Sequence, residues 1–243
     1  MNKVMLNTAV FLTEMNDGQS QINLLKNLTQ PIDGFEVRGE FFKDDKADEL
    51  HQLMTLAQEK SYSFYYSIPE ILFTNGELNE HLAEHFRIAS EYKIDSLKIS
   101  LGVVNLPTPE QVTVLNNLIK VTGVNLTIEN EPNPNGTIEH LVDVCRTLTE
   151  LGFLGGYTFD AGNWYWINED PIAAMNALAK YTTVLHLKNI HNQETTLLDT
   201  GDTDWQALCA KVTDSTPIIL EYQINPADLA DELNKLKQYL KVS

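Results

Sequence analysis

The stretch Gly155-Gly-Tyr-Thr-Phe-Asp-Ala-Gly-Asn-Trp-Tyr-Trp166 decides the fold. Its segment from Tyr157 to Asp160 is typical of a short β-strand, because Tyr, Thr and Phe favour extended backbone. Gly162 follows two residues later and permits a tight turn. Asp160 is therefore expected at the C-terminal tip of a strand, in front of a loop. In parallel α/β folds, this end of the sheet carries the chemistry.

Three further strand-like runs also end on a side chain that can bind a metal ion. They are Leu126-Thr-Ile-Glu129, Thr183-Val-Leu-His186 and Pro217-Ile-Ile-Leu-Glu221. Together with Asp160, these residues follow one another at intervals of roughly 30 residues, the length of one βα unit with its crossover. One ligand per unit on successive strands is the arrangement that a metal site at the mouth of a barrel needs.

Length and charge restrict the partners. With 243 residues, the chain can bury a large core as one domain. Its formal net charge of −17 argues against nucleic-acid binding and against docking on an anionic membrane, since both depend on Lys and Arg. The simplest interpretation of this charge is solubility, and whether the chain forms a homo-oligomer is left open.

Cysteine usage and hydropathy indicate the compartment. Cys145 and Cys209 fall in helical patterns far apart in sequence, as is common in a reducing environment. No apolar run reaches the ~18 residues of a membrane span. Val4 to Leu12 is apolar, but Asn7 and Thr8 interrupt it and no small-residue cleavage site follows. We interpret it as the first strand and expect a cytoplasmic protein.

Strand and helix patterns alternate along the whole chain. The expected strands are Lys3–Phe11, Gly34–Phe42, Ser61–Ile68, Ser96–Leu101, Asn125–Glu129, Tyr157–Asp160, Thr183–Lys188 and Pro217–Tyr222. The expected helices are Ser20–Leu28, Lys46–Lys60, Asn79–Lys93 and Thr137–Leu151, with others that begin at Thr108-Pro109, Asp170-Pro171, Asp204-Trp205 and Asn225-Pro226. Ser, Thr, Asp or Asn before Pro is a typical helix start.

This alternation predicts a parallel α/β fold, and eight repeats predict a closed (β/α)₈ TIM barrel that forms a single domain over residues 1–243. A doubly wound open sheet is the alternative. It more often has a glycine-rich phosphate turn after its first strand, whereas Thr13-Glu-Met-Asn-Asp-Gly18 contains one glycine.

Charged residues alternate with apolar ones in several expected strands. The polar series are Glu36, Arg38 and Glu40; Lys98 and Ser100; and His186 and Lys188. Because helices cover the outer face of a barrel, the apolar series must point outward and the polar series into the barrel. Buried charges are costly unless they are paired or bound to something. They therefore form either an internal lattice of ion pairs or a binding site.

Glu129, Asp160, His186 and Glu221 together offer three carboxylates and one imidazole. This set suits one divalent ion such as Mn, Co, Mg or Zn, and it lacks the thiolates of a structural zinc site. Glu131 shares a face with Glu129 and could replace it. We prefer Glu129, because the prolines that follow Glu131 place that residue in a loop.

The chain resembles the sugar phosphate isomerase/epimerase family of xylose isomerase-like barrels. The matching pieces are Gly34-Phe-Glu-Val-Arg38, Thr127-Ile-Glu-Asn130, Phe159-Asp-Ala-Gly-Asn163, His186-Leu-Lys188, Gly201-Asp-Thr-Asp-Trp205 and Leu220-Glu-Tyr222. The branch of 2-ketogluconate-type epimerases is the most similar, on the pieces Phe35-Glu-Val-Arg-Gly-Glu-Phe41, Leu97-Lys-Ile-Ser-Leu-Gly102 and Phe159-Asp-Ala-Gly-Asn-Trp164. The resemblance implies a divalent metal on Glu129, Asp160, His186 and Glu221, with both glutamates as acid and base.

The chain differs from the ketose 3-epimerases of this group at two positions. Asn163 stands where they carry a histidine, and Asn192 stands where they carry an arginine. A free-ketose substrate therefore does not transfer from the resemblance. The DNA-repair endonucleases of the superfamily have more histidines and a basic surface, which this chain lacks.

We expect an isomerase or epimerase that moves a proton through an enediolate of a small sugar, sugar acid or sugar phosphate. A metal-dependent lyase or dehydratase, or a non-catalytic barrel that binds a sugar or metal, is the alternative. A divalent metal would leave its three carboxylate ligands with one net negative charge. Arg38, Lys98 and Lys188 carry three positive charges on the same inner faces, which favours an anionic substrate. The expected substrate-binding residues are Arg38, Glu36, Lys98, Asn163, Trp164, Lys188 and Asp202.

Overall fold

A closed barrel of parallel strands forms the centre of the computed structural model, which describes residues 2–43 and 45–242. Within these residues eight strands build the barrel, namely β1 (Val4–Asn7), β2 (Gly34–Arg38), β3 (Ser63–Thr74), β5 (Ser96–Gly102), β6 (Asn125–Glu129), β7 (Gly156–Asp160), β8 (Thr182–Leu187) and β11 (Ile218–Leu220). Around the barrel they follow the order β2, β1, β11, β8, β7, β6, β5, β3, and pairing of β3 with β2 closes the ring. The predicted single-domain TIM barrel is therefore confirmed, and the open sheet is excluded.

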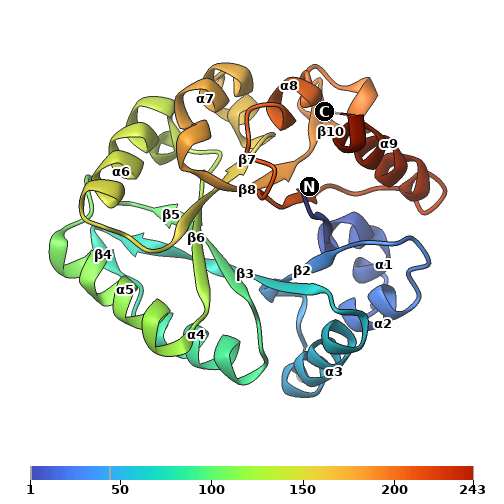
Figure 1. Cartoon of the computed structure of the whole chain (residues 1–243), viewed down its shortest axis with the longest axis horizontal. Coiled ribbons are helices and arrows are strands. Elements are labelled where there is room, and N and C mark those ends of the chain that lie inside the picture. Colours follow the sequence, from blue (N-terminus) through green and yellow to red (C-terminus); the bar gives the residue numbers. More distant parts are fainter. Residues whose placement is uncertain (1, 44, 243) are drawn as a thin grey trace.

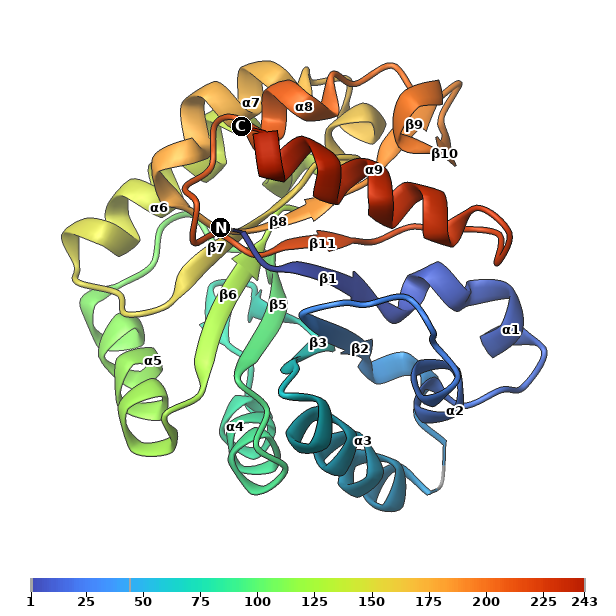
Figure 2. The same ribbon diagram turned by 45° about the vertical axis from the view of Figure 1, so that its right-hand side comes forward.

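Helices surround the strands as an outer ring (Figure 1). They are α1 (Leu12–Asn16), α2 (Gln21–Lys26), α3 (Lys46–Lys60), α4 (Leu82–Glu91), α5 (Pro109–Thr122), α6 (Ile138–Glu150), α7 (Pro171–Leu178), α8 (Trp205–Cys209) and α9 (Leu229–Val242). The C-terminal helix α9 runs along β11 and contacts the N-terminal strand β1 (Figure 2). The chain thus returns to its start, as closure requires.

The helix starts follow the expected chemistry. Thr108 caps α5 and forms a capping box with Gln111, with Pro109 at the first turn. Asp170 caps α7 in front of Pro171. Two helices begin later than expected: α4 begins at Leu82 instead of Asn79, and α9 begins at Leu229, with residues 226–228 in a turn before it.

Strand β11 is shorter than the expected Pro217–Tyr222. Strands β1 and β2 are also shorter than the sequence pattern predicts. Strand β1 stops at Asn7, whose side-chain oxygen accepts a hydrogen bond from the Ala9 N–H at 2.8 Å and starts a 3₁₀ helix. Strand β2 stops at Arg38, and Gly39–Phe41 form another 3₁₀ helix. A Cβ atom on Gly39 would meet Pro69 Cδ at 2.5 Å. Both early stops bend the chain at the C-terminal mouth, where apolar content alone does not reveal the end of a strand.

Strand β3 is longer than predicted. Its pairing with β5 shifts register between Ser67 and Ile71, around Pro69, which has no N–H to donate. Beyond this bulge it continues to Thr74 and pairs with β4 (Glu77–Leu78) in a hairpin. Strands β9 (Asn189–His191) and β10 (Glu194–Thr196) form a second hairpin after β8. Both hairpins extend strands at the same end of the barrel.

The barrel interior has an apolar layer below a polar one. Met5, Val184 and Ile219 form a separate buried cluster with Tyr65, toward the N-terminal ends of the strands. The large apolar core lies outside the barrel, between strands and helices. This leaves the C-terminal half of the interior to polar side chains.

The remaining sequence features concern membrane spans and cysteines. None of the described helices is long and apolar enough to cross a membrane. Cys145 and Cys209 are free and buried, and burial raises the pKa of each thiol to about 12. Both thiols are therefore protonated and act as packing groups.

Candidate metal centre

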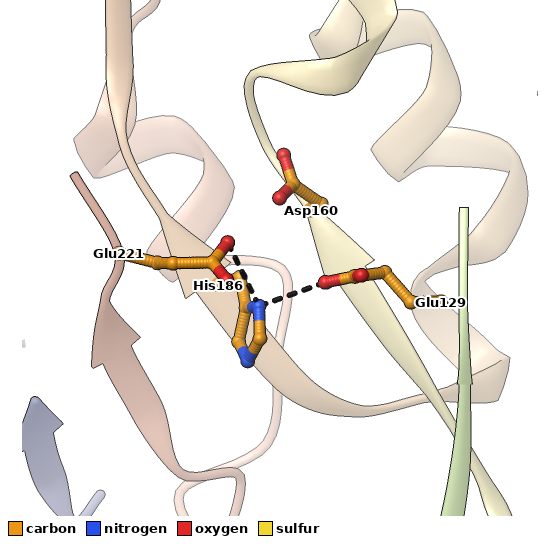
Figure 3. Close-up of side chains that lie close together, drawn as sticks. All are labelled: Glu129, Asp160, His186 and Glu221. Carbon is orange, nitrogen blue, oxygen red and sulfur yellow. Dashed lines mark ion pairs between the residues drawn. The ribbon is translucent and has the colours of Figure 1, made fainter. Parts of the chain in front are cut away.

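The side chains of Glu129, Asp160, His186 and Glu221 converge at the C-terminal end of the barrel (Figure 3). Each offers one ligand atom, and these atoms all lie within 4.8 Å of one another. The four side chains are at most 7% exposed. The sequence-based set is thus brought together by β6, β7, β8 and the residue after β11.

The Asp160 carboxylate is fixed by the backbone that follows it. Its Oδ1 atom accepts hydrogen bonds from the Gly162 N–H at 2.8 Å and the Asn163 N–H at 3.0 Å. Its Oδ2 atom lies 2.7 Å from Lys188 Nζ. The turn after β7 therefore aims the Oδ2 side of the carboxylate toward the cluster.

Gly162 serves this turn in a different way from the one its sequence position suggests. Its φ is −91°, which any residue can adopt, so the turn does not need the conformational freedom of glycine. A Cβ atom would instead meet Lys188 Cδ at 2.7 Å. Glycine at this position leaves room for the lysine that contacts Asp160.

The positions of His186 and its neighbours fit a shared ion. His186 Nδ1 lies 2.9 Å from Glu129 Oε1 and 3.1 Å from Glu221 Oε2. Nevertheless Glu129 Oε1 and both ring nitrogens of His186 have no aligned hydrogen-bond partner among the described residues. Ligands of one ion with bonds of roughly 2.0–2.2 Å point at a common centre rather than at one another. The donor set and the buried unpartnered atoms therefore fit a divalent ion.

Three cations surround the cluster and pair with its carboxylates. Lys98 Nζ lies 2.6 Å from Glu129 Oε2. Lys188 Nζ lies 3.2 Å from Glu221 Oε2, in addition to its contact with Asp160. Arg38 lies 3.5 Å from Glu221 Oε1 through Nη1 and 2.7 Å from Glu40 Oε1 through Nε. The predicted inward polar series of β2, β5 and β8 thus meet at one place.

Burial and these ion pairs shift the pKa values in opposite directions. Burial raises the pKa of Asp160 to about 6, against the lowering effect of Lys188. Burial also acts to raise the pKa of Glu221, but His186 and Lys188 hold it well below its usual value. The pKa of Glu129 is lowered, because Lys98 outweighs the effect of burial. Asp160 is therefore the carboxylate of the cluster that takes up a proton most readily, and Glu129 and Glu221 stay ionised.

The same ion pairs raise the pKa values of the two buried lysines. Burial lowers the pKa of Lys98, but the carboxylates of Glu129 and Glu221 raise it above its usual value. Asp160 and Glu221 do the same for the pKa of Lys188. Both lysines are therefore ammonium ions inside the barrel.

A polar cavity of about 330 Å³ opens above the cluster. Four of the expected substrate-binding residues line it, namely Arg38, Lys98, Asn163 and Lys188. The other three do not reach its wall. Trp164 is fully buried against Phe159, Glu36 is fully buried beneath His186, and Asp202 is on the surface 2.9 Å from His191 Nδ1.

A larger cavity of about 500 Å³ lies elsewhere, under helix α6. Gly155, Gly156 and Thr183 place it at the N-terminal ends of β7 and β8, and most of its other lining residues are apolar. It contains none of the four ligand-type residues. The smaller, polar cavity is therefore the candidate functional site.

Two asparagines that support the cluster were not singled out from the sequence. Asn130 accepts a hydrogen bond from the Asp160 N–H at 2.8 Å and donates to the Asp160 carbonyl at 3.1 Å. Asn7 donates to Glu36 Oε1 at 2.6 Å and to Glu221 Oε1 at 3.2 Å. Asn130 directly follows Glu129, and Asn7 interrupts an apolar run, so both were visible as polar residues at strand ends.

The fold and this constellation define a class of (β/α)₈ barrels with a candidate metal site at the C-terminal mouth. The chain belongs to the xylose isomerase-like TIM barrel family, whose model matches residues 32–239. No protein of curated function matches the chain in sequence.

Several solved structures share the fold over nearly the whole chain. A D-tagatose 3-epimerase-like protein is 15% identical with a TM-score of 0.68, covering 99% of this chain and 97% of that one. The 3-keto-D-glucoside 4-epimerase from E. coli is 13% identical with a TM-score of 0.65, and both chains are covered completely. A probable 3-DHS dehydratase from Bacillus anthracis is 14% identical with a TM-score of 0.72, covering 97% and 98%.

Proposed function

We propose that the protein is a divalent-metal-dependent isomerase or epimerase of a small sugar, sugar acid or sugar phosphate. The observation that carries this proposal is the convergence of Glu129, Asp160, His186 and Glu221 within 4.8 Å at the base of a polar cavity. The epimerases among the structural neighbours support it. Mn, Co, Mg and Zn all suit the donor set.

The chain's own residues supply the acid and base. A bound divalent ion would act as a Lewis acid toward a substrate carbonyl oxygen and so acidify the adjacent C–H bond. Glu129 and Glu221 lie on opposite sides of the His186 ring in Figure 3, at the end of strand β6 and directly after strand β11. One carboxylate would remove the proton and the other would return one, each step typically worth ~10²–10⁴-fold in rate.

We further propose that the substrate carries an anionic group. Arg38, Lys98 and Lys188 line the cavity, and each now pairs with a carboxylate of or near the cluster. An ion bound by those carboxylates would compete for their charge and leave the cations available to the substrate. Arg38 is the best anchor, because its planar guanidinium can hold a carboxylate or phosphate with two parallel hydrogen bonds.

A dehydratase of the same family is the second candidate. Lys98 is buried, protonated and lines the cavity, so it could donate a proton to a departing hydroxyl group. The probable dehydratase among the structural neighbours has the same fold. Both candidates begin with removal of a proton next to a carbonyl group and differ in whether water leaves.

Proton exchange with solvent tests the proposal. Protein loaded with Mn²⁺, Co²⁺, Mg²⁺ or Zn²⁺ would be incubated in deuterated water with a panel of neutral sugars, sugar acids and sugar phosphates. Isomerase or epimerase activity puts deuterium on one carbon and yields an isomer of unchanged formula. A dehydratase yields a product lighter by one water. Saturable binding without exchange across the whole panel would instead indicate a non-catalytic barrel.

A further inference from the structure

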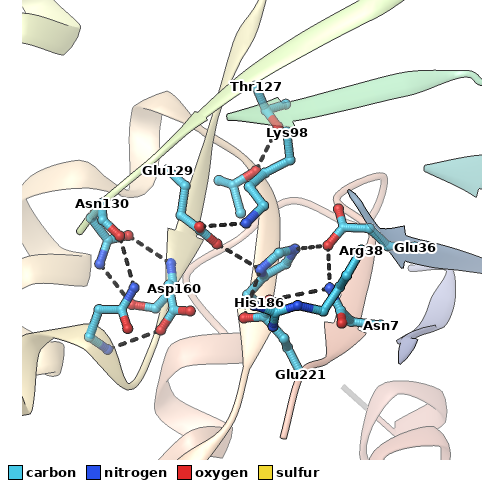
Figure 4. A network of polar contacts seen from close by, with 12 residues as sticks. Asn7, Glu36, Arg38, Lys98, Thr127, Glu129, Asn130, Asp160, His186 and Glu221 are labelled. Carbon is cyan, nitrogen blue, oxygen red and sulfur yellow. Dashed lines mark hydrogen bonds and ion pairs between the residues drawn. The ribbon is translucent and has the colours of Figure 1, made fainter. Parts of the chain in front are cut away.

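The two ring nitrogens of His186 face different partners. Nδ1 lies near Glu129 Oε1 and Glu221 Oε2, at 2.9 and 3.1 Å. Nε2 points the other way and lies 3.1 Å from Glu36 Oε1 (Figure 4). Nδ1 is therefore the nitrogen that the ring presents to the other ligand atoms, while Nε2 faces a carboxylate that offers no atom to the cluster.

Glu36 is placed where a carboxylate is costly. It is fully buried, and its Oε2 atom has no hydrogen-bond partner among the described residues. Leaving a charged oxygen buried without a partner costs several kcal/mol, so packing alone does not account for glutamate at this position. Its Oε1 atom has two polar neighbours: Nδ2 of Asn7, which donates a hydrogen bond at 2.6 Å, and Nε2 of His186, which lies at 3.1 Å without hydrogen-bond alignment. The carboxylate of Glu36 therefore faces the ring.

Asn7 connects this carboxylate to the cluster. Its Oδ1 atom accepts the Ala9 N–H at 2.8 Å, which fixes the amide, and its Nδ2 atom then donates to both Glu36 Oε1 and Glu221 Oε1. The position of Glu36 is thus tied to that of a ligand glutamate. Strands β1, β2, β8 and β11 all contribute to this one unit.

We propose that Glu36 is a positioning residue for the metal site, which holds the His186 ring so that Nδ1 faces the ion and which strengthens that nitrogen as a ligand. This inference rests on the proposed metal-dependent function. A carboxylate on the far nitrogen of a metal-binding histidine fixes the ring's tautomer and orientation and raises its basicity, and losing it typically costs 10–100-fold in metal affinity. Glu36 therefore serves the ion through His186 and does not contact the substrate.

Two substitutions separate the charge from the hydrogen-bond acceptor. Glu36→Gln keeps an oxygen next to Nε2, and Glu36→Leu removes both the charge and the acceptor. We expect the dissociation constant for Mn²⁺, measured by calorimetry, to rise about 10-fold in the first variant and toward 100-fold in the second. The matched control is Glu49→Gln, since Glu49 is also buried but accepts the Ile22 N–H on the outside of the barrel. It should bind Mn²⁺ as the wild type does.

A spectroscopic readout distinguishes positioning from folding. In cobalt-loaded protein, the remaining ring N–H of a metal-bound histidine gives a strongly shifted, exchangeable proton signal. We expect slow exchange of this proton with water in the wild type and fast exchange in Glu36→Leu, with unfolding curves showing that both are folded. Wild-type Mn²⁺ affinity in both Glu36 variants, or an equal loss of affinity in Glu49→Gln, would overturn this inference and leave the proposed function standing. A wild-type protein that binds none of the divalent ions would overturn the proposed function and the inference together.

Discussion

The two layers inside the barrel are opposite in character although the same strands build them. On β1 and β8, and across the C-terminal end of β11, an apolar residue is followed two positions later by a polar one. These pairs are Met5 and Asn7, Val184 and His186, and Ile219 and Glu221. The lower members pack into one apolar cluster, and the upper members enter the polar network around His186.

The comparison shows that the residues expected to stabilise the barrel and those expected to serve its chemistry are only two positions apart in each of these segments. A fully buried aliphatic side chain contributes about 1.5–3 kcal/mol. Buried ion pairs such as that of Lys98 and Glu129 often contribute less than apolar residues of the same volume. We infer that the lower layer stabilises the barrel, and that the upper layer is kept for function at a cost in stability.

The largest effect is expected from the upper layer. Glu221→Gln keeps an oxygen near the ion but removes a base, so deuterium exchange into the substrate should fall about 10²–10⁴-fold. The change keeps the volume of the side chain, and thermal unfolding should show a folded protein. Near wild-type exchange in this variant would remove Glu221 from the chemistry.

The lower layer should show the converse behaviour. Ile219→Ala opens a cavity beneath the site and should lower the free energy of unfolding by about 2–5 kcal/mol, measured in urea. Uptake of the divalent ion by the folded fraction should remain that of the wild type. If the variant stayed fully stable but lost the ion, the two layers could not be treated as separate.

Replacing a buried ion pair tests the cost of the upper layer. The double variant Lys98→Met/Glu129→Leu exchanges the pair for apolar side chains of similar size. In the presence of chelator, we expect the double variant to be roughly 1–4 kcal/mol more stable than the wild type. When the metal ion is supplied, we expect it to be inactive. Lys98→Met alone leaves a buried carboxylate unpaired and should be less stable. A double variant that unfolds more easily than this single variant would show that the pair supports the fold.

The smallest effect concerns the rim of the cavity. Arg38→Met should raise KM for an anionic substrate roughly tenfold more than for its neutral analogue, since hydrogen bonds to charged groups are worth about 1.5–3 kcal/mol. Arg87→Met is the control, because Arg87 pairs with Glu84 and Glu91 on the surface of α4. Equal changes for both substrates would mean that Arg38 serves only as an ion-pair partner of Glu40 and Glu221.

The fold was predictable because its signals are local. Alternating strand and helix patterns, and caps such as Thr108 and Asp170, depend on near neighbours in the chain and appear in the structure as expected. The ends of β1 and β2 were not predicted, because their stop depends on side-chain contacts and close packing at Asn7 and Gly39. The bulge and hairpin of β3 likewise depend on contacts with β5 and β4.

The site was predictable only in part. Residues at strand ends identified the four side chains that the structure brings together, and Glu129 rather than Glu131 belongs to this cluster. Glu131 instead accepts the Gly102 N–H at 3.1 Å. Alternation gives the face of a strand but not the depth within the barrel, so Glu36 was expected in the cavity although it lies beneath His186.

The measurement that tests the central claim most directly is the metal content of the purified protein. Protein prepared without chelator would be analysed for elements, together with His186→Ala, Asp160→Ala and the control His140→Ala on helix α6. We expect about one divalent ion per chain in the wild type and the control, and loss of most of it in the other two variants. Full metal content in both His186→Ala and Asp160→Ala would contradict the assignment of the metal centre.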